Sequence, residues 1–229
     1  MSRAADKIIV ALDVPTKRNA LELVEQLHDQ ISFFKIGLQL YTAEGPEIVR
    51  ALLAAGAKVF LDLKLFDIPN TVGRAVESAN QLGVQMLTIH LGGGGDMIRA
   101  AIAARANGIA IFGVTVLTSA TEQTLREIGI SGTVNDQVLR LARLGVEQGI
   151  DGVVASPHEI KMVRRELGEK IKMVVPGIRP SWAVAGDQKR VMTPIEALDA
   201  GADYLVIGRP ITAHPHPSEA VAKILDELN

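Results

Sequence analysis

A six-residue segment of the sequence carries the residues best suited to charge chemistry: Asp62, Lys64 and Asp67. Asp62 and Lys64 are two positions apart, so on a strand their side chains project from the same face. A carboxylate beside an ammonium can stabilise charge that develops on a bound substrate. This segment is therefore the first candidate for a catalytic centre.

Asp13 and Lys35 extend this candidate, because each lies in or directly after another short apolar run that is typical of a strand. Two carboxylates and two ammoniums would then meet at the ends of three consecutive strands. Buried charges are costly unless they are paired, so a single Asp–Lys pair would equally suit a structural ion pair. The larger set, followed by Asp67, favours a function.

The elements that must position these residues alternate along the chain. Short β-branched runs predict strands at residues 8–12, 33–36, 58–63, 86–90, 109–116, 152–155, 173–175 and 204–207. Apolar residues at three- and four-residue spacing predict helices at residues 19–27, 44–55, 71–82, 96–106, 133–148, 157–167, 193–200 and 218–228. Strict alternation requires parallel strands with crossover helices.

About eight strands are what a closed TIM (β/α)8 barrel requires. We therefore predict one α/β domain of this fold over residues 1–229, ahead of an open doubly wound sheet, because no dinucleotide fingerprint opens the first βα turn. Functional groups of such a barrel lie at the carboxyl ends of its strands. Pro69 suits a helix start at that end, and Asn70 or Thr71 is expected to cap this helix.

Composition narrows the class of protein. Hydrophobic residues make up 48% of the chain and aromatic residues 3%, which predicts a core built mainly of Ala, Val, Leu and Ile. The scarcity of aromatics and a formal net charge of −2 argue against a nucleic-acid partner. The chain has no cysteine, which excludes thiolate chemistry and disulfides. It shows neither a signal peptide nor a membrane-length apolar stretch, so a soluble cytoplasmic protein is expected.

Two arginines mark a candidate anion site. Arg179 and Arg209 follow glycine turns after the seventh and eighth predicted strands, where barrels often hold phosphate. Gly177 and Gly208 would let backbone N–H groups approach an anion closely. Surface arginines in ordinary turns would look similar, but their occurrence at both loops favours a phosphate site.

The segment Asp-Leu-Lys-Leu-Phe-Asp-Ile-Pro-Asn-Thr at residues 62–71 closely resembles the signature of orotidine 5′-monophosphate decarboxylases. The resemblance extends over nearly the whole chain, including residues 10–13, 34–37, 114–119, 151–154, 176–179, 186–188 and 206–212. It implies a TIM barrel that converts orotidine 5′-monophosphate to uridine 5′-monophosphate in pyrimidine biosynthesis, without a cofactor or a metal.

The resemblance also implies roles for the charged residues. Lys64 would protonate C6 of the pyrimidine, with Asp62 beside the substrate carboxylate. Lys35 and Asp13 would complete the alternating charges and contact the ribose. Lys64, Asp62, Asp67 and Lys35 together form the expected catalytic set.

The remaining positions of the resemblance concern binding and assembly. Thr118 would contact the pyrimidine, and the phosphate would be bound by Gln188 and Arg209, with Arg179 and Gly208 in the same loops. The resemblance further implies a homodimer with shared sites, in which Asp67 and Thr71 reach into the partner's site; Ile68 between them is also expected to bind substrate. Many members carry His where this chain has Phe66, so this position is not expected to be catalytic.

The histidines carry weaker signals. His214 and His216 lie in a proline-rich segment without an acidic neighbour in sequence and are expected to be solvated loop residues rather than metal ligands. His90 could support the site or be a structural histidine, and the glycines at residues 92–95 predict a tight turn into a helix.

Two other functions are compatible with parts of the pattern. A sugar-phosphate decarboxylase or aldolase-like synthase on the same scaffold has a related Asp-x-Lys-x-x-Asp segment but needs a divalent metal. Residues 68–71 and Gln188 favour the nucleotide substrate instead. A catalytically silent phosphate-binding barrel would have no need of the Lys64 charge cluster.

Overall fold

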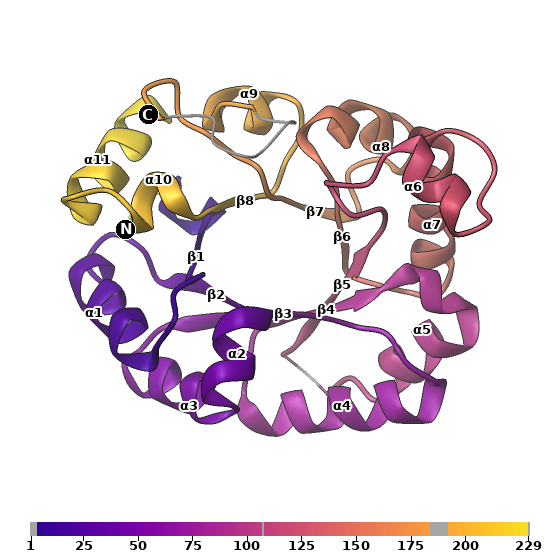
Figure 1. Ribbon diagram of the computed structural model, residues 1–229, viewed down its shortest axis with the longest axis horizontal. Coiled ribbons are helices and arrows are strands. Elements are labelled where there is room, and N and C mark those ends of the chain that lie inside the picture. Colours follow the sequence, from indigo (N-terminus) through magenta and orange to yellow (C-terminus); the bar gives the residue numbers. More distant parts are fainter. Residues whose placement is uncertain (1–3, 107, 184–191, 229) are drawn as a thin grey trace.

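The computed structural model describes residues 4–106, 108–183 and 192–228. Its strands form a closed parallel barrel in sequence order (Figure 1). They are β1 (Ile8–Ala11), β2 (Phe33–Gly37), β3 (Lys58–Leu65), β4 (Met86–His90), β5 (Ala110–Val114), β6 (Gly152–Val154), β7 (Lys172–Val175) and β8 (Tyr204–Ile207). The predicted TIM barrel is confirmed, because each predicted strand has a counterpart that overlaps it.

Helices surround the barrel on its outer side (Figure 1). Those that the periodicity predicts are α1 (Lys17–Leu27), α3 (Glu47–Ala54), α4 (Pro69–Leu82), α5 (Gly94–Ala103), α7 (Val134–Glu147), α8 (Ile160–Leu167), α9 (Pro194–Asp199) and α11 (Pro217–Glu227). The described residues also form the short helices α2 (Leu38–Glu44), α6 (Glu122–Glu127) and α10 (Arg209–Thr212), which the periodicity does not predict. None of the described helices is long and apolar enough to span a membrane.

The start of α4 differs from the prediction. Ile68 is the N-cap residue, Pro69 opens the helix, and no side chain caps it. Asn70 and Thr71 therefore lie inside the first turn, and the capping role predicted for them is wrong. Pro69 lacks an N–H and is already held at a helical φ, so a turn that begins with it has one fewer donor to satisfy.

Buried side chains form two clusters, one on each surface of the barrel wall. The outer cluster lies between strands and helices and is almost entirely aliphatic, as predicted. The inner cluster contains Phe33, Phe60, Met86 and Phe112, so the prediction of an aliphatic core does not hold inside the barrel. An eight-stranded barrel has an interior that side chains just fill, and large rings fill it with few residues. These side chains form an apolar floor.

Residues two positions beyond this floor face the same interior, because side chains alternate along a strand. Lys35 follows Phe33 in this way, Asp62 follows Phe60, and Thr88 follows Met86. All three are buried polar residues. The inner wall of β2, β3 and β4 therefore changes from apolar to polar toward the carboxyl ends of the strands.

At the amino end of the barrel, one hydrogen-bond pattern recurs before β4, β6 and β8. Gln85, Asp151 and Asp203 each donate their backbone N–H to a carbonyl of the preceding strand. The side chain of each also accepts from the N–H of the same strand residue, which is Val59, Ile111 and Met173, respectively. These reciprocal pairs hold neighbouring strands in register at the end opposite the predicted site.

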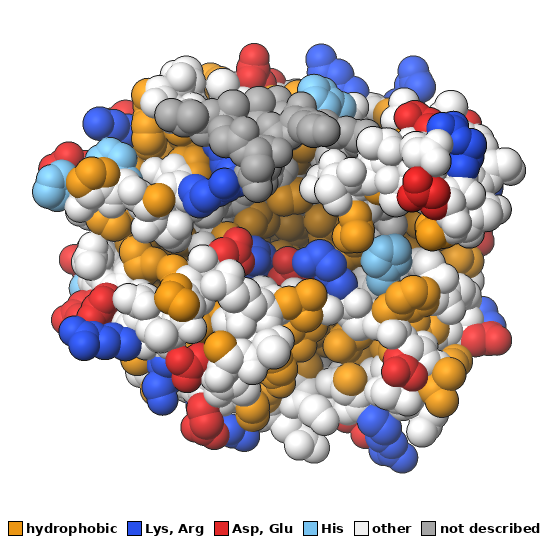
Figure 2. All heavy atoms as spheres, viewed as in Figure 1, with side chains coloured by type: hydrophobic (Ala, Val, Ile, Leu, Met, Phe, Trp, Pro, Cys, Tyr) orange, Lys and Arg blue, Asp and Glu red, His pale blue; other side chains and the backbone are white. Residues whose placement is uncertain are grey.

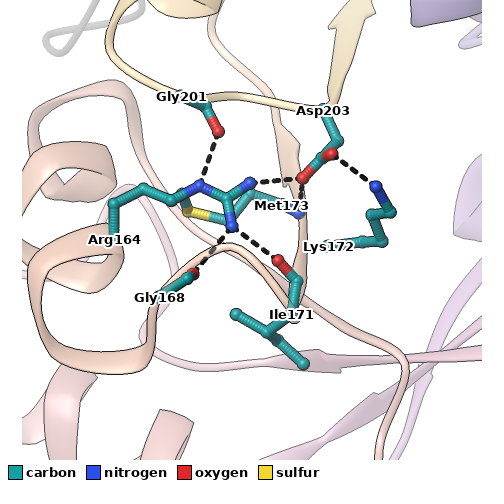
Figure 3. A network of polar contacts seen from close by, with 7 residues as sticks. All are labelled: Arg164, Gly168, Ile171, Lys172, Met173, Gly201 and Asp203. Carbon is teal, nitrogen blue, oxygen red and sulfur yellow. Dashed lines mark hydrogen bonds and ion pairs between the residues drawn. The ribbon is translucent and has the colours of Figure 1, made fainter.

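Asp203 also belongs to a charge network (Figure 3). Its carboxylate pairs with the guanidinium of Arg164, and its Oδ1 lies 2.9 Å from Lys172 Nζ. The guanidinium donates in addition to three backbone carbonyls, those of Gly168, Ile171 and Gly201. Charged and backbone groups here are joined into one closed network.

Candidate active site

A cavity of about 340 Å³ opens at the carboxyl ends of the strands. In Figure 2 it corresponds to the hollow at the centre of the face, where acidic and basic side chains gather beside a hydrophobic interior. Its lining includes eight of the predicted site residues: Asp13, Lys35, Asp62, Lys64, Thr118, Arg179, Gly208 and Arg209. The volume lies in the range of small-molecule sites.

The four charged residues from β1, β2 and β3 form an alternating row. Lys64 Nζ lies 2.8 Å from Asp62 Oδ2, and Lys35 Nζ lies 3.7 Å from the same oxygen. Lys35 Nζ is also 3.0 Å from Asp13 Oδ1. The side chains of Lys35 and Asp62 are only 10% and 13% exposed, so each of these buried charges has the pairing that its burial requires.

Asp62 and Lys64 meet as expected, but a regular strand is not the reason. Four residue steps from Leu61 to Leu65 on β3 lie opposite two steps from Leu87 to Ile89 on β4. Lys64 has a φ of 51°, in the left-handed region that side chains with a Cβ rarely occupy. The irregular end of β3 directs the ammonium back onto the carboxylate. Strained backbone of this kind is frequent at functional sites.

The Lys64 ammonium has donors to spare. It carries three N–H donors, and within the described ranges its one hydrogen bond goes to Asp62. Its side chain is 32% exposed and lines the cavity. A ligand in the cavity would therefore meet a cation that is anchored on one side and available on the other.

The two arginines of the predicted phosphate site line the same cavity. Arg179 is buried, and its Nη1 donates to the Ile178 carbonyl at 3.0 Å. Arg209 is exposed and opens α10, for which Gly208 is the N-cap residue. The predicted turn after β8 thus leads directly into a short helix. Gln188, the other predicted phosphate residue, lies outside the described residues.

Asp67, Ile68 and Thr71 lie apart from the cavity lining described above. They belong to the connection between β3 and α4 and to the first turn of α4, and all three are exposed. Asp67 Oδ1 accepts from the Ile68 N–H at 2.6 Å. Ile68 and Phe66, on either side of Asp67 in the sequence, are 67% and 63% exposed.

His90 has the contacts of a structural histidine. Its Nδ1 accepts from the Gly92 N–H at 3.1 Å, and its ring stacks on Phe66 with 5.5 Å between centroids. Burial and the nearby charge of Lys64 both lower the pKa of His90 below its ordinary value. The glycines after it form the expected turn, a 3-10 helix at Leu91–Gly93 that leads into α5.

Sequence reasoning overlooked two residues of the site. A Cβ at Gly37 would lie 2.8 Å from Lys35 Nζ, so the ion pair occupies the space that a side chain would need. Thr88 Oγ1 lies 3.0 Å from Asp62 Oδ1 and 2.8 Å from the backbone N of Lys64. A hydroxyl among the otherwise apolar residues 86–89 of β4 is the signal that could have identified Thr88.

Comparison with known proteins agrees with this geometry. Residues 6–224 match the model of the family described as "Orotidine 5'-phosphate decarboxylase / HUMPS family". The chain is 49% identical to the orotidine 5'-phosphate decarboxylase of Moorella thermoacetica, over 98% of this chain and 93% of that protein. It is 44% identical to that of Heliobacterium modesticaldum, over 98% and 96% of the two chains.

A solved structure gives the same result in three dimensions. The crystal structure of orotidine 5'-phosphate decarboxylase from Lactobacillus acidophilus superposes with a TM-score of 0.86 at 34% identity, covering 98% of this chain and 99% of that one. The family match, the relatives and the charged cavity of the barrel lead to one conclusion: this chain belongs to the orotidine 5'-phosphate decarboxylase / HUMPS family.

Proposed function

We propose that this chain decarboxylates orotidine 5′-monophosphate to uridine 5′-monophosphate, the carboxy-lyase step of pyrimidine biosynthesis. The names of its relatives support the substrate. The observation that carries the chemistry is the Lys64 ammonium, which Asp62 anchors at 2.8 Å while it lines the cavity. A preorganised cation is what a reaction that develops negative charge needs.

In the proposed reaction the bond between C6 and the substrate carboxyl carbon breaks, and its electron pair stays on C6. The carboxylate leaves as CO₂. The resulting carbanion lies in the plane of the ring, so the π-system does not delocalise it. Lys64 stabilises this charge and then transfers a proton from Nζ to C6, and the neutral amine regains a proton from water. Asp62, next to the substrate carboxylate, adds repulsion that is relieved when CO₂ leaves.

The rest of the cavity would bind the other parts of the nucleotide. Asp13 and Lys35 would contact the ribose hydroxyls, and Thr118 the pyrimidine. Arg179, Gly208 and Arg209 line the cavity beyond β7 and β8, and together with Gln188 they would hold the phosphate. An arginine fork matches phosphate oxygens well. Phosphate binding far from C6 can contribute to catalysis by fixing the ring against Lys64.

The decisive assay follows the ultraviolet absorbance of the orotate ring when the purified protein meets orotidine 5′-monophosphate in the presence of a chelator. Rapid loss of the orotate absorbance is the expected result. An unchanged spectrum, together with Mg²⁺-dependent turnover of a sugar phosphate, would contradict the proposal and favour the metal-dependent synthases. Tight nucleotide binding without turnover would favour a silent binding protein.

We further infer that two copies of the chain share their active sites. Asp67, Ile68 and Thr71 would contribute to the cavity of the partner. Their exposure supports this inference, since Ile68 and Phe66 present apolar surface beside the acidic Asp67. Exposed apolar side chains next to a polar residue are a frequent feature of interaction surfaces.

Mixing two inactive variants tests the shared site. Lys64→Ala and Asp67→Ala are each expected to lose activity alone. In an equal mixture that has exchanged subunits, half the dimers are mixed, and each of these holds one site with both residues intact. About a quarter of wild-type activity should therefore return. A mixture as inactive as its components, or a dilute monomer with full activity, would disprove sharing.

A further inference from the structure

Thr88 is a fully buried polar residue next to the charge row, which is the alternating row of Asp13, Lys35, Asp62 and Lys64. It lies on β4 with no exposed surface, and the regular part of this strand pairs Thr88 with Phe112 on β5. A β-branched side chain in this setting has little rotamer freedom. Its hydroxyl is therefore held at one place, between the side chain of Asp62 and the main chain of Lys64.

The direction of both hydrogen bonds follows from the chemistry of the groups. A backbone N–H can only donate, so at 2.8 Å the Thr88 oxygen accepts from Lys64 N. The single hydroxyl proton is then used at 3.0 Å for Asp62 Oδ1. The other carboxylate oxygen, Oδ2, receives the Lys64 ammonium. One continuous loop runs from the Lys64 main chain through Thr88 and Asp62 to the Lys64 ammonium.

The same contact compensates for the irregular end of β3. Thr88 is the β4 residue between Leu87 and Ile89, where the pairing with β3 shifts register. Its hydroxyl takes the N–H of Lys64, the residue with a φ of 51°. The backbone conformation that turns the ammonium toward the carboxylate thus depends on a side chain of the neighbouring strand.

We propose that Thr88 is a positioning residue of this reaction, whose hydroxyl ties the Lys64 main chain to the Asp62 carboxylate and so fixes the Lys64 ammonium for proton transfer. This inference rests on the decarboxylation proposed above. Thr88 contacts the two charged residues and does not line the cavity, so it acts through them. Its loss should lower the rate of the chemical step more than substrate binding.

Thr88→Val tests the proposal, because valine has nearly the shape of threonine without the hydroxyl. We expect kcat on orotidine 5′-monophosphate to fall about 10- to 100-fold while KM changes less than about threefold, since a small misplacement of the ammonium affects mainly the transition state. Thr88→Ser retains the hydroxyl and should recover most of kcat.

Thr115→Val is the matched control. Thr115 follows β5, has no exposed surface, and donates from Oγ1 to the Val154 carbonyl at 3.2 Å rather than to a charged side chain. Its replacement should affect the melting temperature as Thr88→Val does, while kcat stays near the wild-type value. If Thr88→Val does not fold, Thr88→Ser and Thr88→Ala replace it, because both remove the same methyl group and differ only in the hydroxyl.

Different results overturn different claims. An active wild-type chain with equal kcat in Thr88→Val, or with Thr88→Ser and Thr88→Ala equally impaired, would overturn the role of the Thr88 hydroxyl alone. The same holds if the loss lies entirely in KM, or if Thr115→Val loses as much kcat as Thr88→Val. A wild-type chain that leaves orotidine 5′-monophosphate unchanged would overturn the proposed function, and this inference with it.

Discussion

Each end of the barrel holds one carboxylate between two cations. At the amino end Asp203 pairs with Arg164 and Lys172, and at the carboxyl end Asp62 pairs with Lys35 and Lys64. Burial does not separate the two clusters, because the carboxylate side chains are 21% and 13% exposed. What separates them is how the remaining hydrogen-bond donors of the cations are used.

At the amino end the protein itself takes up the donors of Arg164, whereas Lys172 is 53% exposed and, among the described residues, bonds to Asp203 alone. The Arg164 guanidinium contacts three backbone carbonyls besides Asp203, and Asp203 also accepts from the Met173 N–H (Figure 3). At the carboxyl end, the described residues leave the Lys64 ammonium with a single hydrogen bond. A structural cluster of charges is thus closed by backbone groups, whereas a cluster built to bind a ligand keeps donors facing a cavity. This distinction favours a function for the carboxyl-end cluster over a purely structural ion pair.

Lys64→Ala should show the largest effect. Removing the cation and proton source is expected to lower kcat about 10⁴-fold or more, because general-acid and electrostatic contributions are lost together. Asp62 retains Lys35 and Thr88 as partners, so the fold should persist. Steady-state kinetics measure kcat, and a melting curve measures the stability of the fold. Near-normal turnover would contradict the role of Lys64 as proton source.

Asp203→Asn should show the opposite behaviour, a loss of stability with kcat retained. Removing this charge from its network should cost about 2 to 4 kcal/mol in the free energy of unfolding, since the Arg164 side chain, only 15% exposed, would lose its charged partner. The exposed Asp199, the last residue of α9, gives the control Asp199→Asn, for which urea unfolding should show no measurable change. A large fall in kcat with unchanged stability would reverse the comparison.

The pH dependence of Asp203 follows from its pKa. Burial raises the pKa, but hydrogen bonds from Lys172, the Met173 N–H and Arg164 outweigh it and leave the pKa below the ordinary 3.8. The stabilisation is therefore present above the unfolded pKa and is lost as the pH falls through the lower folded pKa. In the Asn variant this acid-dependent part of the stability should be missing.

Gly37→Ala should weaken catalysis without unfolding the protein. The new Cβ would meet Lys35 Nζ at 2.8 Å and Asp13 Oδ1 at 3.1 Å, and the flexible lysine can move away at little cost to the fold. Displacing this ammonium should lower kcat/KM about 10- to 100-fold. Gly73→Ala on α4 is the control, because its Cβ would have only ordinary contacts. Equal kinetics in the two variants would show that Lys35 tolerates displacement.

His90→Asn should show the smallest effect, on the pH dependence of stability. The folded-state pKa of His90 is lowered by burial and by Lys64, so the unfolded chain binds a proton first as the pH falls through about 6.5. Wild-type stability should therefore decline below that pH until folded His90 is also protonated. Asparagine can still accept from the Gly92 N–H. The free energy of unfolding of this variant should depend less on pH in this range than that of the wild type. Parallel pH profiles would contradict this.

The sequence by itself determined the barrel and most of its charged site. Alternating apolar runs predict all the strands, because parallel strands buried on both faces need continuous apolar segments. The charged residues at strand ends predict a shared site, since the carboxyl ends of a parallel barrel meet at one face. Asp13, Lys35, Asp62 and Lys64 do meet there.

Only the tertiary structure decided which groups hold these charges in place. The shifted register of β3 and the positive φ of Lys64 have no pattern in the sequence, because they arise from pairing with β4. Thr88 lies on β4, so its contacts with Asp62 and Lys64 on β3 depend on a register that local sequence does not encode. Sequence thus determined the charges of this site, and packing between strands decided how they are aligned.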